Sequence, residues 1–240
     1  MHFEIEGKKY YLENDGNINC IMLYGSYARH ENDLYSDIDI LIITEKAMMK
    51  QYIILDTSGK RIPEKWISIY SKESIEKMKK YTSLFLWHIK LEASYLYKSD
   101  LYMDDILNDL PKYLGTGEDI YQYKVICQDI KQLMKKNQFY TLFYELSLLA
   151  SLVRNIAIAF CYINGKMCFG RIKPVILLIE EYPLFSIKEY MELYAYRSLY
   201  NNSEGSYCEE VDLEFVWKWI YIVEKLIRFV EEEICIRKNF

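Results

Sequence analysis

The stretch LYGSYARHENDLYSDIDILI, residues 23–42, decides the fold of the N-terminal half of this chain. An apolar run ends in Gly25-Ser26, a polar and turn-prone segment follows, and two aspartates then open a second apolar run. We predict strands over 20–24 and 37–44, with a short helix over 26–30 between them. Because residues i and i+2 of a strand point to the same face, Asp37 and Asp39 are expected to project side by side, about 7 Å apart.

The Gly-Ser element and the two aspartates predict two halves of a site for a metal-bound polyphosphate. Neighbouring carboxylates repel each other unless a cation lies between them. An all-oxygen pair suits Mg²⁺, which keeps its remaining positions for water and phosphate oxygens. Glycine lets the backbone turn sharply and approach a ligand, and free amides at a helix start attract phosphate. For either element alone a plain turn or a solvated strand edge is the favoured explanation, but the pair at this spacing favours the site.

The same residues closely resemble the signature of the DNA polymerase beta-like nucleotidyltransferase superfamily. In that signature an apolar residue and Gly-Ser precede Asp-x-Asp, after a gap like the one seen here. Ten residues, 27–36, separate Ser26 from Asp37. With Ser36 directly before Asp37, the pattern is most similar to the small bacterial branch that contains the minimal and the antibiotic nucleotidyltransferases.

This resemblance implies a Mg²⁺-dependent enzyme that transfers a nucleoside monophosphate to a hydroxyl group. The donor would be ATP, which gives AMP, or another nucleoside triphosphate. Asp37 and Asp39 would be the catalytic ligands of one or two Mg²⁺ ions. The residues that the resemblance assigns to nucleotide binding are Gly25, Ser26, Arg29 and Ser36.

The chain departs from the superfamily at a third carboxylate, which usually comes from a neighbouring strand. We predict that strand over residues 64–70, and the resemblance places Trp66, which cannot bind metal, at the position of the acid. Strand alternation puts Glu64 on the same face. Glu64 is therefore the expected catalytic substitute, with a solvated surface glutamate as the equal alternative. Without a third acid, the resemblance implies a one-metal or slow enzyme, or a binding-only relative.

Three residues outside the motif leave alternatives open. Glu145 lies in an apolar helix, where a carboxylate is costly unless it is paired or functional. Related antibiotic nucleotidyltransferases take a base from their helical half, so Glu145 is a candidate general base, although an ion pair with Arg154 or a lysine is the favoured explanation. Arg154 is either such a partner or a contact to phosphate or acceptor. His88 is expected to be packed and hydrogen-bonded rather than in contact with the acceptor.

The chain changes character near residue 110. Before it, strand and helix signals alternate, with a candidate helix over 45–52, a helix starting at Ser71, another over 83–93 and an edge strand over 95–97. Beyond it, Pro111 and two nearby glycines mark a linker. Helices are then predicted over 118–136, 138–163, 174–181, 187–200 and 211–236. The second of these is apolar nearly all round, so it should form the buried centre of a bundle.

We therefore predict an α+β protein of two domains. Residues 1–110 would form an α/β nucleotidyltransferase domain with a mixed sheet, and residues 111–240 an all-α helical bundle. The bundle would bind the acceptor, as in antibiotic-modifying nucleotidyltransferases, or resemble a HEPN-type bundle. HEPN ribonucleases carry Arg and then His on one helix, whereas Arg154 is followed by no such His.

Composition narrows the class of partner and the compartment. Hydrophobic residues make up 51% of the 240 residues, enough for a substantial core. The net charge of −5 disfavours a broad grip on nucleic acid. The six cysteines form no Cys-x-x-Cys pair, so free thiols in a reducing cytoplasm are expected. The charged N-terminus does not resemble a signal peptide, and no membrane span is expected because the richest apolar run is interrupted by Arg154.

Two functions from different classes fit these observations. The favoured one is nucleotidyl transfer to a small hydroxylated molecule, such as an aminoglycoside or lincosamide antibiotic, with a protein hydroxyl as the variant acceptor. The acidic net charge favours a cationic acceptor. The alternative is an antitoxin-like nucleotidyltransferase or weakly catalytic interaction module that acts on a protein partner, with its bundle as an oligomer surface, for example in a homodimer.

Overall fold

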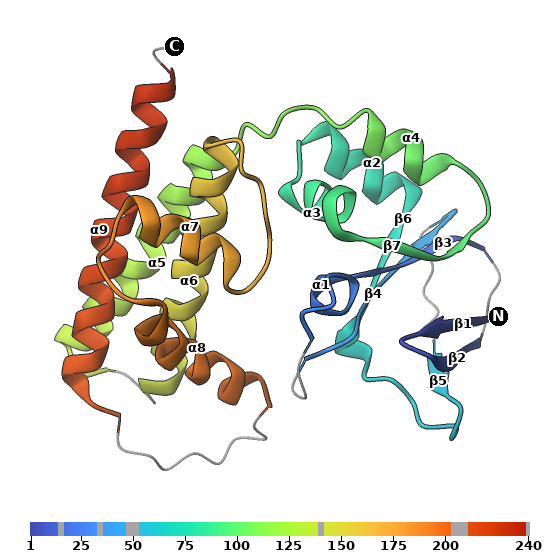
Figure 1. Ribbon diagram of the computed structural model, residues 1–240, viewed down its shortest axis with the longest axis horizontal. Helices are drawn as coiled ribbons and strands as arrows, with labels where there is room; N and C mark the ends of the chain where they lie inside the picture. The colour runs from blue at the N-terminus through green and yellow to red at the C-terminus, as the bar shows by residue number, and fades with distance from the viewer. Residues whose placement is uncertain (14–16, 33–35, 47–52, 139–141, 203–210, 239–240) are drawn as a thin grey trace. The chain divides into compact units, whose positions relative to one another are not determined.

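The computed structural model describes residues 1–13, 17–32, 36–46, 53–138, 142–202 and 211–238 of the chain (Figure 1). The chain divides into two compact units, Met1–Tyr113 and Leu114–Phe240. Unit 1 combines strands with the helices α1 to α4, and the described part of unit 2 is built from the helices α5 to α9. The predicted α+β class, with a sheet-containing N-terminal part and a helical C-terminal part, is confirmed.

Unit 1 contains two sheets, whose strands are β1 His2–Ile5, β2 Lys8–Glu13, β3 Ile18–Tyr24, β4 Asp39–Thr44, β5 Ile53–Asp56, β6 Ile67–Ser71 and β7 Ser94–Lys98. The smaller sheet is antiparallel and has the order β1-β2-β5. The larger sheet has the order β6-β4-β3-β7. In it β4 and β6 run parallel, while β3 is antiparallel to both β4 and β7. The larger sheet is therefore mixed, as predicted.

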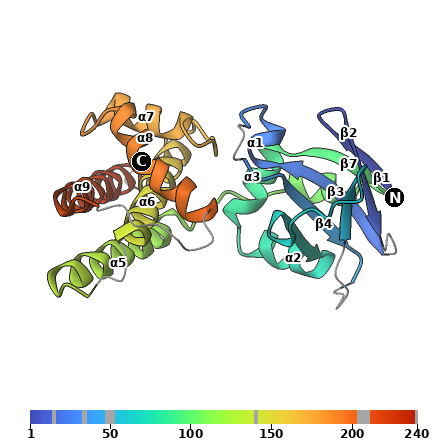
Figure 2. The same ribbon diagram turned by 90° about the horizontal axis from the view of Figure 1, so that it is seen from below.

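The central strands β3 and β4 are covered on both faces, which explains their nearly unbroken apolar sequence. Ile21 and Ile40 point into a core shared with the smaller sheet. Met22 and Leu41 point into a second core, which is shared with the helices α2 Lys72–Lys80, α3 Leu84–Glu92 and α4 Tyr102–Asn108. Figure 2 shows β1 and β2 on one side of these strands and α2 and α3 on the other. Burying one such side chain contributes about 1.5–3 kcal/mol, so the two cores hold β3 and β4 firmly in place.

Serine caps explain where two of these helices begin. The Ser71 hydroxyl accepts a hydrogen bond from the Ser74 amide at 3.2 Å at the start of α2. The Ser83 hydroxyl accepts one from the Phe85 amide at 3.2 Å at the start of α3. Such caps satisfy amides that have no partner within the helix. Both predicted helices are confirmed, and the predicted edge strand is β7, at one edge of the larger sheet.

Two of the strand boundaries that differ from the prediction bear on the candidate site residues. β4 begins at Asp39, so Asp37 lies in the segment before the strand. Residues 64–66 form a 3₁₀ turn, η1 Glu64–Trp66, and β6 begins only at Ile67. The Trp66 amide donates to the Pro63 carbonyl at 3.0 Å, which closes this turn and keeps it out of the sheet. The helix expected over 45–52 lies mostly outside the described residues.

Unit 2 is built around α6. Its helices are α5 Thr116–Lys135, α6 Leu142–Ile163, α7 Lys173–Glu181, α8 Ile187–Asn202 and α9 Leu213–Lys238. α6 packs against each of the other four, and most of its residues are buried (Figure 1). This confirms the predicted central helix. By length and composition α6 is also the one helix of the described residues that could cross a membrane, but 67% of that segment is buried inside the unit, as in the core helix of a bundle.

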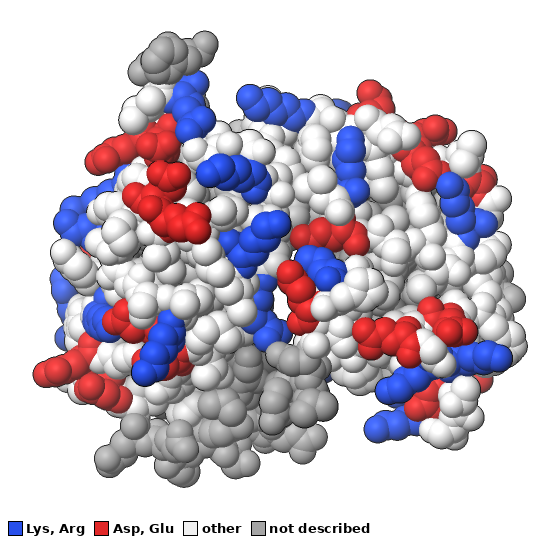
Figure 3. Space-filling model, in the orientation of Figure 1, with Lys and Arg blue, Asp and Glu red and all other residues white. Residues whose placement is uncertain are grey.

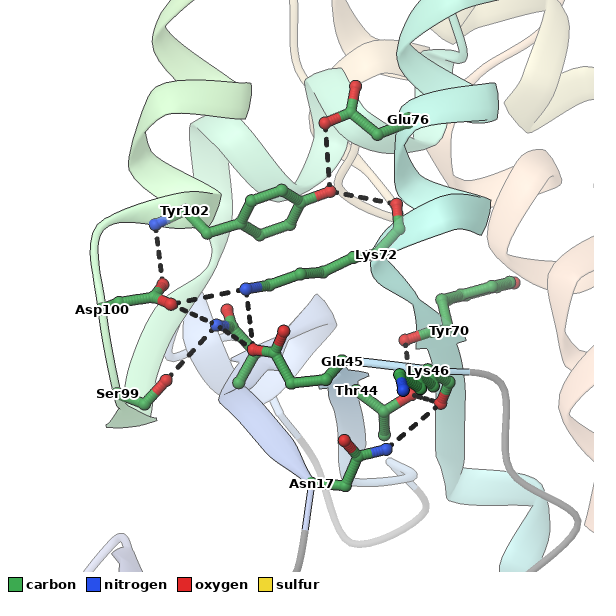
Figure 4. A network of polar contacts seen from close by, with 11 residues as sticks. Asn17, Thr44, Glu45, Lys46, Tyr70, Lys72, Glu76, Ser99, Asp100 and Tyr102 are labelled. Carbon is green, nitrogen blue, oxygen red and sulfur yellow. Dashed lines mark hydrogen bonds and ion pairs between the residues drawn. The ribbon is translucent and has the colours of Figure 1, made fainter.

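A polar network closes the end of the β3–β4 pair at which β4 finishes (Figure 4). Asn19 of β3 is buried and donates hydrogen bonds to Glu45 at 3.0 Å and to Asp100 at 2.8 Å. The Lys72 ammonium lies 2.7 Å from Glu45 and 3.4 Å from Asp100. It also lies 4.6 Å from the ring centroid of Tyr102. A lysine from α2 therefore lies beside both carboxylates at this end of the strands and offsets part of their repulsion.

Candidate functional site

Gly25 and Asp39 meet at the opposite end of the same two strands. Gly25 has a φ of +71°, a conformation that residues with a side chain rarely adopt. A Cβ atom on Gly25 would lie 2.0 Å from Oδ2 of Asp39 and 2.9 Å from its Cγ. Both distances are too short for non-bonded atoms. Glycine is therefore required here for two reasons, the backbone conformation and the approach of the Asp39 carboxylate.

Strand pairing brings the turn and the Asp-x-Asp segment together. Tyr24, the last residue of β3, pairs in register with Asp39, the first residue of β4. The Tyr24 hydroxyl lies 3.1 Å from the Ser68 hydroxyl on β6. The Tyr24 ring packs edge-on against the rings of Phe85 and His88 of α3, with 5.7 Å between ring centroids in each case. Burial raises the pKa of Tyr24, and the nearby Asp39 charge adds to this rise, so the phenol stays protonated near neutral pH.

The other residues of the motif lie along the two segments that meet here. Ser26 belongs to the single-turn helix α1 Gly25–Ala28, and its carbonyl oxygen accepts a hydrogen bond from the Glu31 amide at 2.9 Å. Ser36 and Asp37 are half-buried in the segment that leads into β4. Because α1 has only one turn, its macrodipole is small. A phosphate at this turn would be held by individual amides.

The donor set suits a cation that shares its ligands with a phosphate. Asp37 and Asp39 would supply carboxylate oxygens, and the bare Cα of Gly25 lets Asp39 lie directly against the turn. Among the described residues, no group of three or more His, Cys, Asp or Glu side chains could hold a metal ion by itself. This arrangement fits Mg²⁺, which is bound through one or two carboxylates together with substrate phosphates, and not a closed structural site.

Comparison with known families agrees with this geometry. Residues 7–101 match the family model described as Polymerase beta, Nucleotidyltransferase, and this range contains both Gly25 and Asp39. These residues form a polymerase beta-like nucleotidyltransferase domain, which lies in unit 1. The protein is accordingly a nucleotidyltransferase.

Two solved structures are similar over most of the chain. One is the spectinomycin adenyltransferase AAD(9) from Enterococcus faecialis, determined with ATP and spectinomycin, with 14% sequence identity, a TM-score of 0.46, and coverage of 88% of this chain and 92% of that chain. The other is a nucleotidyltransferase-like protein from Exiguobacterium sibiricum 255-15, with 11% identity, a TM-score of 0.39, and coverage of 89% and 70%. No curated protein matches the chain.

Arg29 of this nucleotidyltransferase is bound to carboxylates. Its Nε donates a hydrogen bond to Oε2 of Glu31 at 2.8 Å, and its Nη1 pairs with Oε2 of Glu92 at the end of α3. The Arg29 side chain is 16% exposed. A guanidinium between two carboxylates is neutralised locally. These contacts therefore do not support the nucleotide-binding role that the sequence suggested for Arg29.

The resemblance expects a third carboxylate near the start of β6, and it places Trp66 at that position. Trp66 packs against the core between the two sheets, and its Nε1 is buried with no hydrogen-bond partner there. The Glu64 side chain is 56% exposed and forms an ion pair with Arg61. The expectation that Glu64 lies on a strand face is wrong, because the alternation of a strand does not apply inside a 3₁₀ turn. The residue that β6 directs to the site is Ser68, through its contact with Tyr24.

The two candidates in unit 2, Glu145 and Arg154, do not form an ion pair with each other. Glu145 is 4% exposed, and its Oε2 has no hydrogen-bond partner among the described residues. Burial raises the pKa of Glu145. Arg154 donates to the Phe169 carbonyl at 2.6 Å. The ion pair that was favoured for Glu145 is therefore absent from the described part of the chain.

His88 in unit 1 has the packed, hydrogen-bonded role that the sequence favoured. Its Nε2 lies 2.8 Å from Oε2 of Glu92, and its ring packs against Tyr24 and Phe85. Sequence reasoning missed Glu92, which no motif spacing connects with Gly25 or Asp39. A glutamate at the end of an amphipathic helix gives no sign in the sequence that it contacts Arg29, 63 residues away in the chain.

Proposed function

We propose that the protein transfers a nucleoside monophosphate, AMP from ATP, to a hydroxyl group of a small molecule. The observation that carries the proposal is the contact between the Gly25 backbone and the Asp39 carboxylate. The start of the α1 turn lies against a carboxylate that would bind the metal, and the two together would suit a metal-bound triphosphate. The match of residues 7–101 to the nucleotidyltransferase family supports the same reaction.

Each residue of the site has a defined task in this reaction. Asp37 and Asp39 would hold Mg²⁺, which when bound neutralises the triphosphate and the leaving pyrophosphate. Amides of the Gly25-Ser26 turn would contact the terminal phosphates. Tyr24, fixed by Ser68 and by the rings of α3, sets the direction in which the chain leaves β3. Most of the rate would come from this positioning, since none of these groups forms a bond to the substrate.

A small, cationic acceptor such as an aminoglycoside is favoured by charge. The chain carries a net charge of −5. On the face of each unit that Figure 3 shows, basic and acidic side chains of the described residues are interspersed. Tight binding of nucleic acid needs many basic groups along one path. This distribution supports a small acceptor over a polynucleotide.

A reducing, cytoplasmic location is part of the proposal. The cysteines of the described residues are free thiols, and three of them are fully buried, namely Cys20, Cys127 and Cys161. Burial raises the pKa of Cys20 and of Cys127 to about 12 in each case. Buried, protonated thiols are unreactive and are typical of cytosolic proteins.

The test is a transfer assay with ATP labelled in its α-phosphate. The wild-type protein is incubated with Mg²⁺ and with aminoglycosides, lincosamides or spectinomycin, and the label is followed into the acceptor. We expect labelled product from at least one acceptor class. Asp37→Asn and Asp39→Asn should each abolish the transfer while their circular dichroism and unfolding curves stay close to those of the wild type. Full transfer by both variants would refute the proposed roles of these aspartates.

The missing third carboxylate favours one second candidate function. The resemblance places Trp66 at the position of that acid, and in the structure Trp66 packs against the core while Glu64 is exposed and paired with Arg61. A site with two carboxylates could bind nucleotide with slow turnover, and the chain would then act through a protein partner, as an antitoxin-like module would. A stoichiometric complex with a purified partner protein, together with ATP binding but no transfer to any acceptor, would support this function over the first.

A further inference from the structure

Glu92 contacts Arg29, which follows the Gly25-Ser26 turn in the chain, and His88, whose ring packs against the residue before the turn. It is the last residue of α3, and its side chain is only 9% exposed. One of its oxygens, Oε2, meets both the Arg29 guanidinium and Nε2 of His88, the latter at 2.8 Å. Glu92 is 63 residues from Arg29 in the chain, so this contact ties separate elements together.

The Arg29 contact holds the chain directly after the turn. Arg29 is the C-cap of α1, and its amide donates to the Gly25 carbonyl at 3.2 Å. A helix of one turn has almost no stability of its own. The geometry of Gly25 and Ser26 must therefore come from contacts outside α1, and the half-buried pair of Arg29 with Glu92 is such a contact.

The His88 contact holds the chain directly before the turn. The His88 ring packs edge-on against the ring of Tyr24, with an interplanar angle of 83°. Tyr24 is the residue before Gly25 and is tied to β6 through Ser68. Glu92 fixes the position of His88 one helical turn earlier on α3. The Glu92 carboxylate is therefore linked to both ends of the turn, through Arg29 after it and through His88 and Tyr24 before it.

The charge state of this network is that of an ion pair. Burial alone would raise the pKa of Glu92, but the hydrogen bonds from His88 and Arg29 outweigh it, and the pKa is lowered overall. The carboxylate is therefore ionised at neutral pH. A guanidinium that already contacts two carboxylate side chains has little positive charge left to offer a phosphate.

We propose that Glu92 is a positioning residue for nucleotide binding, which holds the Gly25-Ser26 turn through Arg29 and His88, and that Arg29 is its partner and not a phosphate ligand. This inference rests on the proposed function. It assigns a role to a residue outside the Gly-Ser and Asp-x-Asp motifs. It also gives Arg29 a role opposite to the one that its position next to the motif suggests.

The test is calorimetric titration of ATP and of AMP into the wild type and variants with Mg²⁺, below the melting temperature of each protein. We expect Glu92→Gln to weaken ATP binding roughly tenfold or more. AMP binding should change little, because AMP lacks the terminal phosphates that the turn would hold. Glu92→Asp, which keeps the charge, should recover part of the ATP affinity. The matched control is Glu31→Gln, which removes the other partner of Arg29, a 48% exposed one, and should leave ATP affinity unchanged.

A double variant keeps the inference testable if Glu92→Gln unfolds the domain. Arg29→Met with Glu92→Gln leaves no buried charge without its partner, which avoids the main cause of unfolding. Positioning predicts that the double variant loses no more ATP affinity than either single variant, since the two residues act as one unit.

Three results would overturn the inference. If Arg29 binds phosphate directly, Glu92→Gln frees its guanidinium, so ATP binding stays the same or tightens while Arg29→Met loses it. If AMP binding falls as much as ATP binding, the effect of Glu92 is general destabilisation. If the wild type binds ATP and no variant differs from it, this inference alone fails, whereas a wild type that does not bind ATP removes the proposed function as well.

Discussion

Both ends of the β3–β4 pair carry carboxylates, but the groups that contact these carboxylates differ between the two ends. At the end where β4 finishes, the Lys72 ammonium lies between Glu45 and Asp100. At the other end, about 17 Å away by strand rise, Asp39 lies against the bare backbone of Gly25. The lysine makes the first end a fixed cross-link between β4, α2 and the segment before α4. The glycine keeps the second end compact without filling it by a side chain, which suits a site whose cation arrives with the substrate.

The largest expected effect comes from Gly25→Ala. Its Cβ would lie 2.0 Å from the Asp39 carboxylate, so Asp39 or the turn must move by more than an ångström. We expect the affinity for Mg²⁺ and ATP together to fall roughly ten- to a hundredfold, measured by calorimetric titration. The matched control is Gly59→Ala, because Gly59 has a φ of +80° and open space around the added Cβ. Both variants should lose about 1 kcal/mol of stability from the backbone strain, but only Gly25→Ala should lose ATP. Equal ATP affinity in the two variants would contradict the assignment of the site.

The next largest effect, on stability, is expected at Glu145. Unlike the carboxylates at the two strand ends, it has neither a lysine nor a glycine turn beside it among the described residues. Its Oε2 is buried without a hydrogen-bond partner there. We expect Glu145→Gln to raise the free energy of unfolding at pH 7 by about 1 kcal/mol, measured by urea unfolding. A loss of stability at pH 7 would show instead that the charged form is stabilised in the folded protein.

The pH dependence of this variant has a defined sign. Burial raises the pKa of Glu145 above its ordinary value of 4.5, so the folded state holds the proton more tightly than the unfolded state. Its contribution to wild-type stability is then fully present below pH 4.5 and declines as pH rises towards the folded pKa. The advantage of Glu145→Gln should therefore be largest near neutral pH and should shrink in acid.

A smaller effect is expected for Lys72→Met, which removes the cation at the fixed end of the strands. Glu45 would then face Asp100 without a lysine between them, and the midpoint of urea unfolding at pH 7 should fall slightly. The hydrogen bond from Lys72 lowers the pKa of Glu45 below its ordinary value of 4.5. Stability from this pair is present above that pH and is lost as pH falls through the lower folded value, so wild type and variant should converge in acid. Loss of ATP binding in Lys72→Met would show that the two ends are coupled.

The smallest effect is expected for Glu64→Gln. Glu64 lies in the 3₁₀ turn, and its contact with Arg61 joins two exposed side chains. Exposed pairs of this kind contribute about 0–1 kcal/mol. Transfer activity and ATP affinity should therefore match those of the wild type. A large loss of activity would mean that Glu64 moves into the site during the reaction and serves as the third carboxylate after all.

The sequence could predict the features that depend on short-range spacing. Gly25 and Asp39 lie at facing ends of two consecutive apolar runs, and antiparallel pairing of neighbouring strands brings such ends together. The helices of unit 2 follow from periodicity, which is why α6 could be identified as the central helix. These signals lie within windows of one or two elements and need no knowledge of tertiary packing.

The remaining features depend on contacts that no local pattern contains. The misplacement of Glu64 arose because alternation does not reveal where a strand begins, and the turn after Pro63 delays the start of β6. The role of Arg29 could not be predicted because its partner Glu92 is reached only when α3 packs on the sheet. The contacts of Glu145 likewise depend on how several helices surround α6.

The most direct test of the central claim is a titration of ATP into the wild type and Asp39→Asn, each with and without Mg²⁺. The account predicts that the wild type binds ATP tightly only when Mg²⁺ is present, and that Asp39→Asn loses this dependence together with most of the affinity. Equal binding by the two proteins, or binding by the wild type that ignores Mg²⁺, would contradict the claim that the contact between Gly25 and Asp39 forms a metal–triphosphate site.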